Sequence, residues 1–105
     1  MKRQPESELK SNIVKWLNLQ KDTFAWSQIT IGIPDGRGGY RRNPNKGAAD
    51  ICFVKCGKAG AMEVKMEKGK VSPEQRAWLE AFDAAGGKAY VVREFGDAAS
   101  VWKEI

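Results

Sequence analysis

The chain has 105 residues, of which 42% are apolar and 30% charged, a size and composition typical of one globular domain. The formal net charge of +5 favours a polyanionic partner such as a nucleic acid, and the absence of apolar runs of about 20 residues argues against a membrane span. No signal-peptide pattern opens the sequence, so we expect a cytoplasmic protein. The sequence has no histidine, which excludes histidine general bases and histidine-bound metal sites.

The sequence pattern predicts seven elements in the order α-β-β-β-α-β-α. They cover residues 6–20 (helix), 24–31, 48–56 and 60–66 (strands), 72–86 (helix), 88–92 (strand) and 97–105 (helix). Ser72, Pro73 and Gln75 predict the start of the second helix, because S-x-x-Q is a capping box and proline is tolerated in the first turn. We therefore expect one α/β domain over residues 1–105, a mixed four-stranded sheet flanked by helices.

Residues 32–47 hold five glycines and two prolines, so we expect a long loop without a packed element. Its basic and aromatic side chains favour contact with DNA phosphates and bases, although a solvated loop is the simpler alternative. These side chains are Arg37, Tyr40, Arg41, Arg42 and Lys46.

Glu63 and Lys65 alternate with apolar residues in the third predicted strand. This alternation is typical of any half-buried strand, with the charged side chains on its wet face. The strand is expected to lie centrally in the sheet, however, where charges are costly unless they are paired or bound to metal. Asp50 begins the neighbouring strand, but a hairpin centred on Lys58 would set it opposite Met66, so a bulge or an offset turn is needed to bring it to Glu63.

Two carboxylates can hold Mg²⁺ or Mn²⁺ with several coordination positions left open, and such an ion activates water for attack on a phosphodiester. A neighbouring lysine can orient the water and neutralise developing charge. The cysteines, Cys52 and Cys56, are too few for a thiolate zinc site and are expected to be small buried residues.

The pattern Asp50…Glu63-x-Lys65 resembles the D…E-x-K motif of the PD-(D/E)xK nuclease superfamily, with Ala49 in place of the proline. Five stretches extend the likeness over nearly the whole chain: "ESELKSNIVKWL", "GAADI", "AMEVK", "GKVSPEQRAWL" and "AAGGKAYVV". Together they resemble the virus-type replication-repair nuclease (VRR-NUC) domain, in particular its short stand-alone members from phages and bacteria. The resemblance implies a restriction-endonuclease-like αβββαβα core and a bacterial host cell.

The resemblance also implies roles for individual residues. Asp50, Glu63 and the main-chain carbonyl of Val64 match metal ligands, and Lys65 matches the catalytic lysine. Glu8 matches an acid that completes the site through water, with Glu6 as an alternative and a plain first-turn acid as the simpler explanation. Gln75 matches a glutamine of the family's S-P-x-Q helix, although helix capping alone explains it.

The activity implied is that of a Mg²⁺- or Mn²⁺-dependent, structure-selective DNA endonuclease. It would act on branched DNA as a homodimer, like Holliday-junction resolvases in DNA repair and recombination. Three alternatives stay open: a flap or restriction-type nuclease with the same site, a non-catalytic DNA-binding module of the same fold, and an RNA-binding protein.

Overall fold

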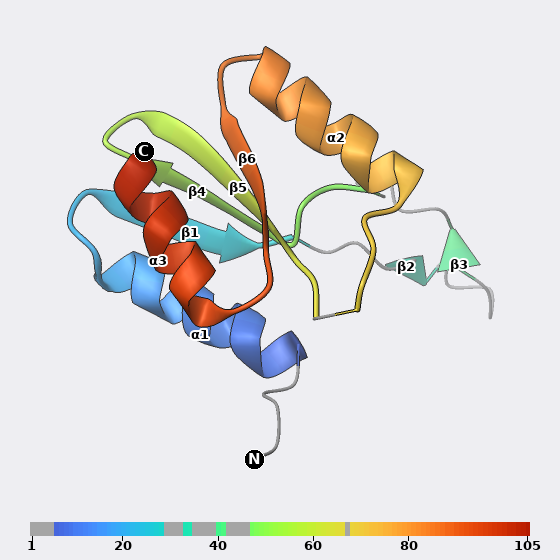
Figure 1. The fold of residues 1–105 in the computed structure, drawn as a ribbon, viewed down its shortest axis with the longest axis horizontal. Helices are drawn as coiled ribbons and strands as arrows, with labels where there is room; N and C mark the ends of the chain where they lie inside the picture. Colours follow the sequence, from blue (N-terminus) through green and yellow to red (C-terminus); the bar gives the residue numbers. More distant parts are fainter. Residues whose placement is uncertain (1–5, 29–32, 35–39, 42–46, 67) are drawn as a thin grey trace.

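The structure is a computed structural model that describes residues 6–28, 33–34, 40–41, 47–66 and 68–105. Its main sheet has the strand order β1–β4–β5–β6 (Figure 1), formed by β1 (Thr23–Ser27), β4 (Ile51–Lys55), β5 (Lys58–Val64) and β6 (Lys88–Val92). β4 is antiparallel to both of its neighbours, β1 and β5, whereas β6 runs parallel to β5. The expected mixed four-stranded sheet is confirmed, and β5 is one of its two central strands.

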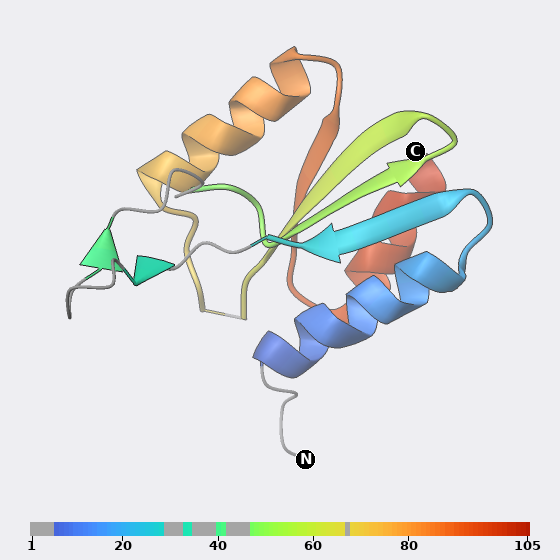
Figure 2. The same ribbon diagram turned by 180° about the vertical axis from the view of Figure 1, so that it is seen from behind.

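Helices cover both faces of this sheet, as Figures 1 and 2 show from opposite sides. α1 (Glu6–Leu19) and α3 (Phe95–Glu104) lie on one face, and α2 (Pro73–Ala84) lies on the other. The larger core is formed by α1, α3 and the sheet, and it includes Leu9, Ile13, Leu17, Ile51, Phe53, Met62, Val64, Val92, Ala98 and Val101. Under α2 the cluster is smaller and consists of Ala49, Cys52 and Ala61 against Trp78, Leu79, Phe82 and Ala89. In the part of the chain that the structure describes, no helix is long and apolar enough to cross a membrane.

The predicted element boundaries need three corrections. α3 begins at Phe95 rather than Asp97, because the Asp97 carboxylate accepts the main-chain N–H of Arg93 at 2.9 Å and so anchors the first turn. The expectation that residues 32–47 hold no regular element is wrong, since β2 (Ile33–Pro34) pairs with β3 (Tyr40–Arg41) as a short antiparallel ladder. Of the strand predicted over residues 24–31, β1 accounts for the part that ends at Ser27, and residues 29–31 lie outside the described residues.

The third correction concerns the hairpin between β4 and β5. The expected centre at Lys58 is wrong, because Lys55 pairs with Lys58 across a two-residue turn made by Cys56 and Gly57. Both turn residues have positive φ, 50° and 81°, as the tight hairpin turns that match strand twist require. Cys56 is therefore exposed at the turn, and only Cys52 is buried as expected.

Candidate active site

The corrected hairpin register brings two acids together at the far end of the hairpin. Ile51 and Met62 form the last backbone pair, and Asp50 and Glu63 are the next residues on the two strands. Continuing the alternation from the turn by one step gives this pair a non-hydrogen-bonded position, where facing side chains approach most closely. Asp50 Oδ2 accepts the main-chain N–H of Val64 at 2.8 Å, so the aspartate side chain continues the ladder. No bulge is needed to join the two carboxylates.

Both acids are almost completely buried, with exposed fractions of 6% for Asp50 and 1% for Glu63. Glu63 Oε1 accepts a hydrogen bond from Gln75 Nε2 at 3.2 Å and lies 3.9 Å from Lys65 Nζ. Glu63 Oε2 is buried without a hydrogen-bond partner among the described residues. A buried carboxylate oxygen without a partner is costly unless a proton or a cation accompanies it.

The electrostatics of the pair reflect this burial. The pKa of Glu63 is raised to about 8, first because burial disfavours the charged form, and then because a protonated Glu63 can donate to the adjoining Asp50 carboxylate, whose negative charge also disfavours ionisation of Glu63. The charges of Lys65 and Lys10 act in the opposite direction. The two lysines therefore offset the burial of the acids only in part, and a divalent cation between the acids would add positive charge.

Gln75 connects this pair to α2. Its main-chain N–H donates to Ser72 Oγ at 3.1 Å and its Oε1 accepts the N–H of Ser72 at 2.9 Å, so the predicted capping box is confirmed. Its Nε2 donates to Glu63. The capping explanation is thus confirmed, and the same amide also contacts Glu63 through its other end, while a role of Gln75 in catalysis stays a prediction.

Gly47 holds the segment before Asp50 against the same helix. It has φ of +90°, and a Cβ atom at this position would lie 2.9 Å from the carbonyl oxygen of Glu74. Only glycine accommodates both the backbone conformation and the close approach. This contact fixes the distance between the chain leading to Asp50 and the helix turn that carries Gln75.

α1 contributes a lysine that was not predicted from the sequence. Lys10 Nζ lies 3.0 Å from Asp50 Oδ1 and 3.8 Å from Glu6 Oε1. Glu8 is exposed, and at about 100° per residue it lies roughly opposite Glu6 and Lys10 around the helix. The geometry places Glu6 on the side of α1 that carries Lys10; the role of Glu8 stays a prediction. The available signal was the i, i+4 spacing of Glu6 and Lys10 beside the apolar stripe.

Among the described residues, no group of three or more acids or cysteines is arranged to hold a metal ion. Asp50 and Glu63 are thus the acids available together, with the Val64 carbonyl as a further candidate ligand. Because the N–H and C=O of one strand residue point to the same side, the Val64 carbonyl is directed to the side of β5 on which Asp50 accepts its N–H.

The segment that follows Lys65 is tied to β6. The main-chain N–H of Lys65 donates to the Val92 carbonyl at 3.0 Å. The Arg93 guanidinium, through one nitrogen, donates to the carbonyls of Met66 and Gly69, each at 2.9 Å. These bonds fix the chain on both sides of the β5 end, and with it the backbone that carries Lys65.

The predicted DNA-contacting residues are only partly covered. Tyr40 and Arg41 form β3. Arg37, Arg42 and Lys46 lie outside the described residues. Contact of these five residues with DNA stays a prediction.

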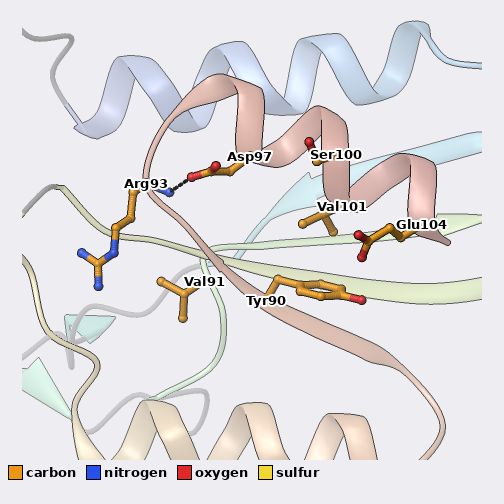
Figure 3. Close-up of a pocket in the computed structure, with 7 residues that line it drawn as sticks. All are labelled: Tyr90, Val91, Arg93, Asp97, Ser100, Val101 and Glu104. Carbon is orange, nitrogen blue, oxygen red and sulfur yellow. Dashed lines mark hydrogen bonds between the residues drawn. The ribbon is translucent and has the colours of Figure 1, made fainter.

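A groove of about 420 Å³ lies elsewhere, between β6 and α3 (Figure 3). It is lined by Tyr90, Val91, Arg93, Asp97, Ser100, Val101 and Glu104. In Figure 3 the Arg93 guanidinium points away from α3. The groove contains neither carboxylate of the Asp50–Glu63 pair and neither lysine beside it.

Comparison with known proteins agrees with this fold. The sequence profile of the VRR-NUC domain matches residues 3–95. A solved structure described as "VRR_NUC domain protein" shares the fold, with a TM-score of 0.67 at 16% sequence identity, over 99% of this chain and 89% of that one. No curated protein sequence matches the chain.

Proposed function

Because this chain belongs to the VRR-NUC domain family, which implies nuclease-type activity, we propose that it is a metal-dependent endonuclease that hydrolyses phosphodiester bonds in DNA. One observation carries the proposal: two buried carboxylates, Asp50 and Glu63, face each other across neighbouring strands with Lys65 beside them. A structural ion pair would not need two acids in contact. A site for a divalent cation would.

The donor set fits Mg²⁺ or Mn²⁺. These ions prefer oxygen ligands, often bind through one or two carboxylates, and keep several positions for water and phosphate. Asp50, Glu63 and the carbonyl of Val64 would hold the ion, and the partnerless Glu63 Oε2 is the oxygen that most needs one. When bound, the ion polarises the phosphoryl oxygens and lowers the pKa of a coordinated water.

The side chains around the acids supply the remaining functions. Lys65 Nζ, 3.9 Å from Glu63 Oε1, is placed to orient the attacking water and, as an ammonium group, to offset the charge that develops on the phosphoryl group; as a neutral amine it would instead take up the proton of the water. Gln75 holds Glu63 in a fixed orientation, and its own orientation is fixed by the helix cap. An acid on α1, Glu6 or Glu8, would reach the ion through water.

The substrate we propose is branched DNA, cut in the manner of a Holliday-junction resolvase. The net charge of +5 supports a polyanionic partner. A domain of this size cannot span a four-way junction alone, so paired cuts would require a homodimer with two sites related by a twofold axis. Lys68, Lys70 and Arg76, exposed near the start of α2, would add to phosphate contact.

The deciding experiment offers the purified protein labelled four-way junction, flap, single-stranded and linear duplex DNA, each with Mg²⁺, with Mn²⁺ and with chelator. We expect the branched substrates to be cleaved with Mg²⁺ or Mn²⁺ and not with chelator. Asp50→Asn serves as the inactive control. If neither metal supports cleavage of any substrate, the nuclease proposal fails. Preferential cutting of flaps would instead favour a flap nuclease, and binding without cutting would favour a DNA-binding module.

A further inference from the structure

Lys10 occupies a position that the proposed chemistry does not use. Its ammonium group reaches from α1 to Asp50 Oδ1 at 3.0 Å, while the other oxygen of Asp50 accepts the Val64 N–H. The lysine side chain is 31% exposed, so it enters the site from its solvent side. The nearest cation to Asp50 is thus supplied by α1, whereas Lys65 on the sheet lies near Glu63.

A divalent ion at this site and the Lys10 ammonium group would compete for the same carboxylate. Both need the carboxylate of Asp50, and two cations sharing one carboxylate repel each other strongly where water is largely excluded. Entry of an ion between Asp50 and Glu63 therefore favours withdrawal of Lys10. The side chain has a second partner for this movement, because Glu6 Oε1 lies 3.8 Å from the same nitrogen, one helical turn earlier and 45% exposed.

We propose that the Lys10 ammonium group is the counter-ion of Asp50 in the metal site. It neutralises Asp50 while the site holds no metal, and it moves towards Glu6 when a divalent ion binds. The inference rests on the proposed function, since it presupposes that Asp50 and Glu63 bind an ion. It assigns Lys10 a positioning role with two consequences: Lys10 stabilises the metal-free fold, and it weakens the affinity for metal.

The test uses the full chain without DNA, so no readout depends on cleavage. Lys10→Met keeps the length and apolar stem of the side chain and removes its charge. Lys15→Met removes an exposed lysine from the same helix and is the matched control. Isothermal titration with Mn²⁺ gives the dissociation constant, and thermal unfolding in chelator and in Mn²⁺ gives the midpoint temperatures.

In Lys10→Met the Mn²⁺ dissociation constant is expected to fall by about tenfold, because a buried acid that has lost its partner gains more from the ion. The midpoint temperature of thermal unfolding of this variant in chelator should be several degrees lower than that of the wild type. Adding Mn²⁺ should raise the midpoint temperature by more than it does in the wild type. Lys15→Met should match the wild type in all three measurements. If Lys10→Met does not fold in chelator, Mn²⁺ is expected to restore folding.

Unchanged or weaker Mn²⁺ binding by Lys10→Met, with normal binding by the wild type, would overturn the role of Lys10 and leave the metal site intact. Failure of Mn²⁺ to restore folding of a variant unfolded in chelator would overturn it equally. If the wild type itself binds no Mn²⁺, the proposed metal site is refuted and the role of Lys10 with it.

Discussion

The raised pKa of Glu63 predicts an unusual pH dependence of stability in the metal-free protein. For an acid whose pKa is higher in the folded than in the unfolded chain, the folded chain retains a proton that the unfolded chain has lost at intermediate pH. The free energy of unfolding should therefore fall as the pH rises from about 4.5 to about 8 and change little beyond, as far as Glu63 is concerned. Glu63→Gln keeps the hydrogen-bonding shape and removes the titration, so this contribution should disappear.

The magnitude follows from the size of the shift. The pKa of Glu63 moves from 4.5 to about 8. At about 1.4 kcal/mol for each unit, the full effect has an upper limit of about 5 kcal/mol, a large share of the stability of a small domain. Mn²⁺ binding requires the deprotonated acid, so the metal should offset the loss and stabilise the protein more at pH 8 than at pH 6.

Urea unfolding in chelator, followed by tryptophan fluorescence between pH 5 and pH 8, measures this effect. Trp16 and Trp102 contact each other beside the larger core, so their fluorescence reports on the packing of α1 against α3. Glu80→Gln removes an exposed acid from α2 and should keep the wild-type slope. Parallel curves for wild type and Glu63→Gln would refute the reasoning, because they would mean that Glu63 does not hold a proton in the folded chain.

Four further substitutions test the site and the backbone that shapes it. Lys65→Met should abolish cleavage of a four-way junction while gel-shift affinity for the same DNA stays within about threefold; lost binding would indicate a structural role. Gly47→Ala should lower the free energy of unfolding by about 2 kcal/mol in urea, since φ is +90° and the new methyl group would lie 2.9 Å from the Glu74 carbonyl oxygen; an unchanged midpoint would contradict this contact. Gly57→Ala should lower the free energy of unfolding by about 1 kcal/mol through its φ of +81° alone, because nothing lies within 4 Å of the added atom. Cys56→Asn should stabilise the turn, because asparagine tolerates positive φ better than cysteine, and equal stability of the two variants would refute the turn assignment.

The elements of the fold were predictable where local chemistry and periodicity agree. Leu9, Ile13 and Leu17 recur at helical spacing and are buried in α1 as that pattern requires. The S-x-x-Q sequence locates the start of α2 because the capping box is a purely local interaction. The role of the Glu63–Lys65 strand as a central strand followed from the order of elements alone.

The register of the hairpin and the contact of Lys10 with Asp50 were not predictable in the same way. Residues 56–60 offer several places for a tight turn, and glycine at both 57 and 60 hides which pair adopts positive φ. Lys10 lies forty residues from Asp50, and its i, i+4 spacing from Glu6, the one local signal in α1, does not show that its ammonium group reaches Asp50. Both facts depend on how distant segments pack.

The meeting of two buried acids is specified by features that lie outside the acids themselves. Five backbone pairs separate the Cys56–Gly57 turn from the step at which Asp50 faces Glu63. A slip of one residue would turn Glu63 to the opposite face of the sheet, so a turn at the other end of the hairpin determines whether the carboxylates can share an ion. Gly47 then fixes the chain before Asp50 against α2, and the helix cap orients Gln75 towards Glu63. The turn, Gly47 and the helix cap each have a local reason in the sequence, and their joint effect is a pair of buried acids that the core of a small domain would otherwise exclude.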